Sequence, residues 1–534
     1  MAKKISVWER LKNLFARPKP PVSAPPPAAP PENASPAPQS ASINAPAAPQ
    51  ENPPVQSEIP SALRPVKQPR LFQPELLPPN PLRPWGPRRP VGSPTDPVVD
   101  PAPATPTTPA PRGLAIDLVL GIDFGTSCTK VVIGDGRHGK AFPIPFGSPA
   151  TDLASWLHPT RLGDETNLKM RLMETPDDPA VRDLVACYLA TVITSARSWF
   201  KENSPGNYSR HNCSWSLNLG FPEKKVRSNS SLALAYRRCA EIALQLVALT
   251  GTPTPQMAAR FRTGEQEIAP AIPPNRIHLY PEIAAQLAGY IKSSYRQRGN
   301  LLLIDVGAGT LDVSTLIIHD NQEEDIVSFH VCDVKPLGVL RLYQARAGAL
   351  NREAGCCATL PVDAFQDGCT AIPDSTGEML NSSFPLPTPA LKKAFEKATE
   401  QFAAEVLGSI HPCLTQFRVL QRDAHLNTGF DPRPGHLRFF LTGGGSRADF
   451  YREHLVQGPL EQQLWQFTRW DPDPAQRAHL EQGLRLESMS TPRNLVGFPE
   501  SLSEHFDRLS VAYGLAQGPE NLPDITGGGD PVPA

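Results

Sequence analysis

The sequence contains no run of 18 uninterrupted apolar residues and no Cys-x-x-Cys pair. A membrane-spanning helix needs about 20 apolar residues, so none is expected, and the spacing of the nine cysteines fits no zinc or redox motif. The formal net charge of the 534 residues is only -1, which gives no general electrostatic reason to bind nucleic acid. We therefore expect a cytoplasmic protein with reduced thiols and no nucleic-acid partner.

Proline, by contrast, is abundant: there are 63, and they are densest in the first fifth of the chain. Residues 18–113 are dominated by Pro, Ala, Ser and Thr, which cannot bury enough apolar surface to offset the loss of chain entropy on folding. We expect this stretch to be a disordered, partly polyproline-II tether. Residues 518–534 are rich in Gly and Pro and are expected to form a flexible tail.

Residues 1–17 place apolar side chains at helical spacing, with Lys and Arg around them. This pattern predicts a short basic amphipathic helix. Such a helix lies on an anionic membrane surface, which would make the protein peripheral to the membrane, or docks into the groove of a protein partner. The alternative is an unstructured basic segment.

A strand–turn–strand pattern at residues 118–133 carries the first candidate site. Gly125 lets the backbone approach a bound group closely because it has no Cβ. Thr126 and Ser127 add hydroxyl and N–H donors that suit phosphate oxygens. Asp123, at the end of the first strand, is placed to hold a hydrated Mg²⁺.

The same pattern recurs at residues 301–318. Its polar and glycine residues follow in a matching order: Asp305, Gly307, Ala308, Gly309, Thr310 and Asp312. Two such hairpins predict a duplicated domain pair, whose turns face each other across a cleft and grip a triphosphate from both sides. The alternative is a pair of ordinary buried hairpins with glycine turns.

Three further segments complete the pattern. Residues 436–441 form an apolar strand that enters a glycine loop, and a helix is expected to start at residue 448. The loop reads Gly443, Gly444, Gly445, Ser446 and Arg447.

Helical periodicity predicts five helices. They cover residues 183–200, 231–250, 281–290, 388–417 (with an irregularity at Pro412) and 506–517. Residues 134–140 are close to the P-loop motif but depart from it in two ways. The position after Lys140 is Ala in place of the Ser or Thr of the motif, and prolines follow where the motif requires a helix. We therefore predict a hairpin turn.

Taken in order, the two hairpins, the helices near residues 282–290 and 510–514 and the glycine loop resemble one superfamily. It comprises actin, the sugar kinases and the seventy-kilodalton heat-shock chaperones. The sequence of these motifs is most similar to that of the chaperone branch. The resemblance covers residues 114–517. It implies an α/β, two-lobed actin-like ATPase fold of duplicated ribonuclease-H-like units. Lobe I would span about 114–298 plus 500–517, lobe II about 299–499, and ATP or ADP with Mg²⁺ would lie between them.

The resemblance also implies residue roles. Asp123 and Asp312 would organise Mg²⁺, largely through water, and the attacking water, while Glu282 and Lys169 would complete the catalytic set. Arg447 would pack over adenine, and Glu396 matches an adenosine-contacting acid. The remaining nucleotide-binding residues would be Gly125, Thr126, Ser127, Gly307, Ala308, Gly309, Thr310, Gly443, Gly444, Gly445 and Ser446.

Two departures from the family pattern concern these residues. The family's first connecting helix usually begins Glu-Pro, whereas the order here is Pro281-Glu282. The basic residues expected just after Glu396 are Thr399 and Glu400 here.

Four functions follow as expectations. The first is a chaperone-like ATPase that hydrolyses ATP slowly and changes its lobe angle to act on a protein partner or client. The chaperones' peptide-gripping domain has no counterpart, because only about twenty residues follow Gly514. The second is an actin-like filament-forming ATPase tethered by its N-terminal helix. The others are a pseudo-enzyme that binds ATP without turnover and a small-molecule kinase, for which no substrate base is evident.

Overall fold

The computed structural model describes residues 115–518 except 149, 205–207, 209–211, 223–229, 292–295, 297–298, 321–324, 355–364, 366–367, 381–386, 429–437 and 457–484. The expected N-terminal helix, the tether and, apart from Gly518, the tail lie outside the described residues. No helix within these described ranges is long and apolar enough to cross a bilayer.

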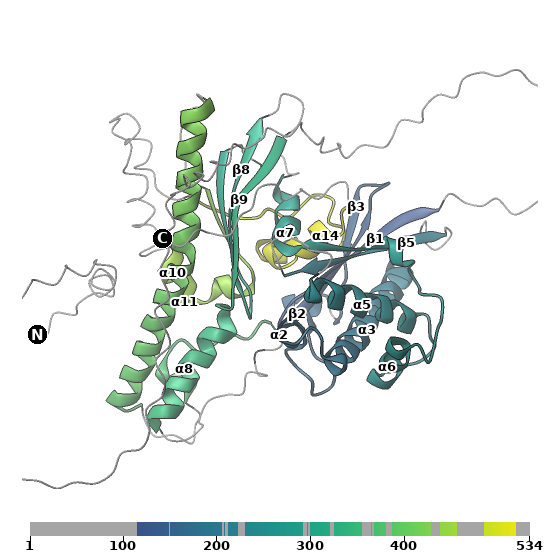
Figure 1. The fold of residues 1–534 in the computed structure, drawn as a ribbon, viewed down its shortest axis with the longest axis horizontal. Helices are drawn as coiled ribbons and strands as arrows, with labels where there is room; N and C mark the ends of the chain where they lie inside the picture. The colour runs from purple at the N-terminus through teal and green to yellow at the C-terminus, as the bar shows by residue number, and fades with distance from the viewer. Residues whose placement is uncertain are drawn as a thin grey trace, which may run out of the picture. The chain divides into compact units, whose positions relative to one another are not determined.

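The first sheet has six strands, five of them in the order β3-β2-β1-β5-β6, with β4 paired to β2 (Figure 1). β1 pairs antiparallel with β2 and parallel with β5, and β5 pairs parallel with β6. Strand bounds are β1 (Ile116–Phe124), β2 (Cys128–Asp135), β3 (Lys140–Pro143), β4 (His158–Pro159), β5 (Cys213–Phe221) and β6 (Ile277–Pro281). Residues 136–139 form the turn between β2 and β3, which confirms a hairpin in place of a P-loop.

The second sheet repeats this arrangement. Its order, β9-β8-β7-β10-β11, places two antiparallel strands on one side of β7 and two parallel strands on the other. Strand bounds are β7 (Gly299–Val306), β8 (Leu311–Asp320), β9 (Asp325–Lys335), β10 (Arg438–Thr442) and β11 (Arg485–Glu487). β7 therefore occupies the position of β1. The shared strand order confirms the duplicated, two-lobed α/β fold that the paired hairpins predict.

Capped helices cover the first sheet. The main ones are α3 (Pro179–Asn203), α5 (Ser231–Val247) and α6 (Pro255–Thr263). α3 begins four residues earlier than its periodicity indicates, because Asp178 accepts a hydrogen bond from the N–H of Ala180 and Pro179 suits the first helical position. Their buried faces join β1, β2 and β5 in one apolar core, in which Tyr188, Tyr236 and Leu120 are fully buried.

Two helices pack between residues of both sheets, α7 (Glu282–Ile291) and α14 (Ser510–Leu515) (Figure 1). A 3₁₀ segment, η6 (Glu500–Arg508), precedes α14, so the single helix expected over residues 506–517 is divided. The two helices meet with almost no side chain between them: a Cβ on Gly514 would lie 1.8 Å from the carbonyl oxygen of Ala285. On the first sheet, a Cβ on Gly134 would lie 1.8 Å from the carbonyl oxygen of Ala516.

On the second sheet, α10 (Pro389–Thr428) lies against β8 and β9, and α8 (Val339–Ala354) packs against α10 (Figure 1). α10 continues through Pro412 and ends eleven residues beyond the expected position. The shorter elements are η1 (Leu153–Trp156), α2 (Leu168–Glu174), η2 (Pro274–Arg276), α9 (Thr376–Met379), η4 (Gly444–Arg447), α11 (Asp449–Tyr451) and the π-helical η5 (Arg452–Val456).

Candidate functional site

The loops that follow β1, β7 and β10 line one cavity of about 570 Å³. These are the first hairpin turn, the second hairpin turn and the glycine loop. Residues of α2, α7 and α8 complete its walls. The two hairpins, whose matching residues Asp123 and Asp305 are 182 positions apart along the chain, therefore do face a shared space.

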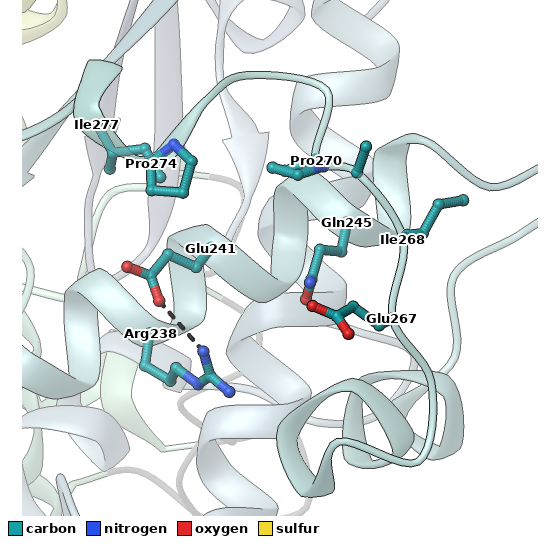
Figure 2. Close-up of a pocket in the computed structure, with 9 residues that line it drawn as sticks. Arg238, Glu241, Gln245, Glu267, Ile268, Pro270, Pro274 and Ile277 are labelled. Carbon is teal, nitrogen blue, oxygen red and sulfur yellow. Dashed lines mark hydrogen bonds and ion pairs between the residues drawn. The ribbon is translucent and has the colours of Figure 1, made fainter.

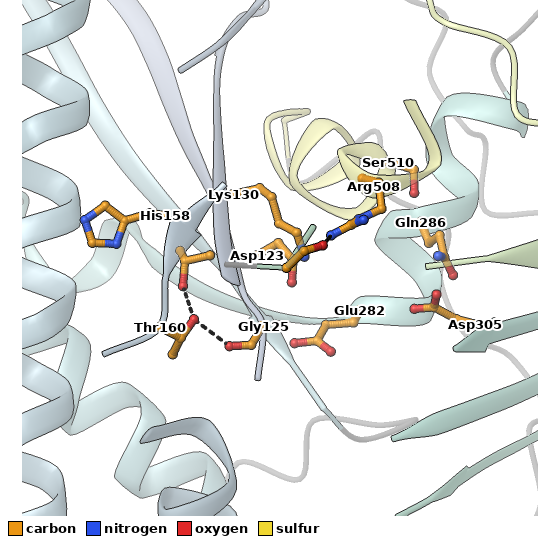
Figure 3. A network of polar contacts seen from close by, with 12 residues as sticks. Asp123, Gly125, Lys130, His158, Thr160, Glu282, Gln286, Asp305, Arg508 and Ser510 are labelled. Carbon is orange, nitrogen blue, oxygen red and sulfur yellow. Dashed lines mark hydrogen bonds and ion pairs between the residues drawn. The ribbon is translucent and has the colours of Figure 1, made fainter. Parts of the chain in front are cut away.

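The first turn is anchored from behind by Thr160 (Figure 3). The Thr160 hydroxyl donates to the carbonyl of Gly125 at 2.9 Å, and its N–H donates to the carbonyl of Ser127 at 2.8 Å. In a planar trans peptide the N–H points away from the preceding carbonyl, so the N–H groups of Thr126 and Cys128 point away from Thr160. Asp123, Gly125, Thr126 and Ser127 all line the cavity.

The second turn is anchored in the same way by the start of α8. The N–H groups of Gly338, Val339 and Leu340 donate to the carbonyls of Gly309, Gly307 and Ala308 at 3.2, 3.1 and 2.9 Å. These carbonyls are thereby held on the α8 side, which fixes the orientation of the following N–H groups. Gly307, Ala308, Thr310 and Asp312 line the cavity.

Lys169 and Glu282 form a buried ion pair inside the cavity. The Lys169 Nζ lies 2.7 and 2.8 Å from the two carboxylate oxygens of Glu282. Burial alone would lower the pKa of Lys169, but the charges of Glu282, Asp123 and Asp312 together raise it. The order Pro281-Glu282 therefore still directs the Glu282 side chain into the cavity.

Carboxylates outnumber lysines here. Asp123 pairs with Lys130 at 2.9 Å, whereas no ion pair is observed for Asp305 or Asp312 among the described residues. Burial raises the pKa of Asp312 well above its ordinary value, and Asp305 and Glu282 raise it further. Its Oδ1 atom is buried with no hydrogen-bond partner in the described part of the chain. The site thus concentrates negative charge that a cation would relieve.

The glycine loop forms another wall. Gly443 has a φ of 83°, and a Cβ there would lie 2.2 Å from Asp305 Oδ1, so a side chain is excluded. Arg447 lines the cavity and makes a two-point ion pair with Asp507, at 3.0 and 2.9 Å. These contacts use donors in the plane of the guanidinium, the geometry of a two-point arginine–carboxylate pair.

Three predicted residues do not line the cavity. Gly309 packs against Thr126 of the first turn, where a Cβ would lie 3.0 Å from the Thr126 hydroxyl oxygen. The Ser446 hydroxyl donates to the carbonyl of Gly443 at 2.7 Å.

The third residue, Glu396, is exposed on α10, because the adjacent Phe395 faces inward against Arg346. The structure therefore does not bring Glu396 to the other candidate residues.

Sequence reasoning missed several residues in and around the site, among them Lys130, Thr160, Gln286 and Arg508. Gln286 of α7 donates to Thr442 at 2.9 Å and lowers the otherwise raised pKa of Asp305 by hydrogen bonding. Lys130 could have been found from its position in the strand after the first turn. Gln286 and Arg508 lie in segments predicted to be helical, and Thr160 follows no motif; only the folded chain brings their side chains to the site.

A second cavity, of about 550 Å³, lies on the outer side of α5 (Figure 2). Arg238 and Glu241, which form an ion pair at 3.3 Å, line it together with Glu267 and several apolar residues. None of the predicted site residues belongs to it.

No protein-family profile and no curated protein matches the chain. Among solved structures, it is similar to a ParM subunit in a 15-stranded filament from Clostridium botulinum, with 13% identity and a TM-score of 0.37. The similarity covers 75% of this chain and 98% of that chain. A likeness this distant carries no inference about function, so the fold assignment rests on the two repeated sheets.

Proposed function

We propose that the chain is a Mg²⁺-dependent nucleotide-binding protein that hydrolyses ATP to ADP and phosphate. The observation that carries the proposal is the convergence of two glycine turns, from two sheets of one topology, on a single cavity. The carbonyls of both turns are held by hydrogen bonds, from Thr160 in one and from the start of α8 in the other, which orients the following N–H groups and suits them to phosphate oxygens.

The carboxylates fit a hydrated Mg²⁺. Asp312 Oδ1 is buried without a partner, and no group of three side chains among the described residues could cage a metal directly. Mg²⁺ usually keeps several of its waters and contacts one or two carboxylates, so Asp123 and Asp312 would hold it largely through water. The ion would neutralise charge on the phosphates.

The chain's own residues would act by positioning and charge, since phosphoryl transfer needs little covalent help from the protein. Gly125, Thr126 and Ser127 would hold phosphates from one lobe and Gly307, Ala308 and Thr310 from the other. Lys169 would place positive charge near the transferred group. Glu282, whose pKa burial raises, would orient the attacking water.

Phosphate release by the wild type and by Asp312→Asn tests the proposal. We expect Mg²⁺-dependent turnover by the wild type, reduced at least about tenfold in the variant, because a charge that organises the transition state is lost. ATP titration with and without Mg²⁺ separates binding from turnover. Equal background rates with intact binding would indicate a pseudo-enzyme, and absence of binding would exclude the proposal.

ATP hydrolysis would serve one of two processes. It would drive copies of this chain to assemble into filaments, or it would drive action on a separate protein partner, as in a chaperone. The chaperone-specific role has no support from relatives, since no family profile or curated protein matches. Sedimentation with and without ATP distinguishes the two, because only assembly moves the protein into the pellet in the presence of ATP. Residues 1–17 would anchor either form to a membrane surface or a partner groove, and vesicle co-sedimentation tests the membrane case.

A further inference from the structure

Arg508 is a buried cation in the cavity, and no carboxylate of the described residues pairs with it. It is 8% exposed, lines the cavity and belongs to the end of η6, directly before α14. Its observed hydrogen bond is from Nη2 to the neutral carbonyl of Gly368, at 2.6 Å. No ion pair to it is formed within the described ranges, whereas Lys130, Lys169 and Arg447 are each paired with an acid.

The surroundings of Arg508 are shaped to admit its guanidinium. A Cβ on Gly444 would lie 2.9 Å from the Arg508 Cζ and 3.0 Å from its Nη2. On the other side, a Cβ on Gly368 would lie 3.2 Å from Nη2 and 2.5 Å from the sulfur of Cys128, the residue after the first turn. The guanidinium thus lies between the glycine loop and the end of the first phosphate turn, and in Figure 3 it extends toward Asp123 and Lys130.

Burying a charge without a counter-charge is costly unless a ligand of opposite sign compensates it. A guanidinium offers five N–H donors in a fixed plane that matches phosphate oxygens. A single carbonyl satisfies only one of them. An anion that enters the cavity would supply the opposite charge and accept from the remaining donors.

We propose that Arg508 binds the phosphate chain of the nucleotide, at the boundary between the first phosphate turn and the glycine loop. The inference rests on the proposed function and adds a phosphate-binding residue to that site. The contact between Arg508 and phosphate would make the affinity for the nucleotide depend on its phosphate groups more than on its nucleoside, because the guanidinium needs a negatively charged partner.

Binding by the full chain tests the assignment, with ADP, AMP and adenosine titrated separately by calorimetry. We expect Arg508→Gln to weaken ADP and AMP binding roughly tenfold or more, the size expected for a lost charge-assisted hydrogen bond. Adenosine binding should change less than twofold. Arg238→Gln, which removes a surface arginine at the second cavity, is the matched control and should bind all three ligands as the wild type does.

Arg508→Lys keeps the charge and serves if the glutamine variant does not fold. It should lose part of the ADP affinity, since an ammonium cannot make the two-point contact. Equal losses for ADP and adenosine, or no loss for ADP, would overturn the assignment. If the wild type itself binds none of the ligands, the nucleotide-binding proposal fails and the role of Arg508 fails with it.

Discussion

At the scale of single residues, seven acids, two lysines and two arginines line the cavity. Asp123 and Glu282 are each paired with a lysine, while removal from water raises the pKa of both Asp305 and Asp312. A fold keeps such groups against their desolvation cost when a ligand uses them. The nucleotide-free protein should therefore carry measurable electrostatic strain at this site.

Replacing Lys169 by Met should strip the buried Glu282 carboxylate of its partner. We expect the free energy of unfolding to fall by about 3–5 kcal/mol, because removing one member of a buried ion pair leaves an uncompensated charge. The double variant Lys169→Met/Glu282→Gln should recover much of the loss. Urea unfolding at pH 7 measures both, with Lys201→Met on the exposed side of α3 as control; equal stability of Lys169→Met and this control would contradict the expectation.

Asp312→Asn should stabilise the nucleotide-free protein at neutral pH. An acid whose pKa is raised on folding contributes stability below its unfolded pKa, about 3.9, and that contribution is lost as the pH rises through the folded value. The wild type therefore weakens between acid and neutral pH through Asp312, and the amide variant does not. We expect the variant to be at least about 1 kcal/mol more stable at pH 7.5, with the difference vanishing near pH 4.

Urea midpoints across this pH range measure the effect. Asp164→Asn, at an exposed loop position, is the control and should follow the wild type throughout. Parallel curves for wild type and Asp312→Asn would mean that Asp312 is not strained.

At the scale of elements, α7 and α14 connect the parts of the fold by backbone contact. Gly514 lies against α7, and Gly121 and Gly134 lie against the end of α14. Contacts this close leave no room for a methyl group, so these glycines are required by packing and not by backbone conformation. Sequence periodicity located both helices, but nothing in it revealed that they pack glycine to backbone.

Gly514→Ala should therefore destabilise the protein by about 3 kcal/mol or more, as overpacking against rigid backbone does. Gly136→Ala in the β2–β3 turn is the matched control, because a Cβ there meets nothing within 4 Å, and it should change stability by less than about 1 kcal/mol. Thermal unfolding of both variants measures the difference. A Gly514→Ala protein as stable as Gly136→Ala would show that the helices can separate without cost.

At the scale of the whole molecule, the repeated sheets place two similar turns on one cavity, the proposed nucleotide site. Ligand should thus stabilise both lobes together. ATP with Mg²⁺ at about 100 times its dissociation constant should raise the free energy of unfolding by about 2.7 kcal/mol. Calorimetric melting should show the rise in Tm, EDTA should reduce it, and an unchanged midpoint at saturating ATP would contradict it.

The matched hairpins let the sequence predict the duplication, both sheets' central strands and the glycine turns that line the cavity. Local signals sufficed there, because glycine turns and β-branched runs are read over a few residues. Glu396 does not line the cavity, because a motif position does not fix which helix face is buried. Arg508 was missed because its partners lie 64 and 140 residues away. The division of residues 500–515 into 3₁₀ and α segments likewise has no periodic signature.

The packing of α14 on Gly121 and Gly134 also bears on how the chain is made. The first sheet is among the earliest structured parts to leave the ribosome, yet its covering helix is synthesised roughly 390 residues after β1, some 20–80 s later at 5–20 residues per second. Until then the surface that α14 occupies stays open to water and to other nascent chains. During translation the first lobe should therefore emerge incompletely packed and rely on molecular chaperones. The folding yield of the first lobe should depend on chaperones more than the folding yield of the second lobe does.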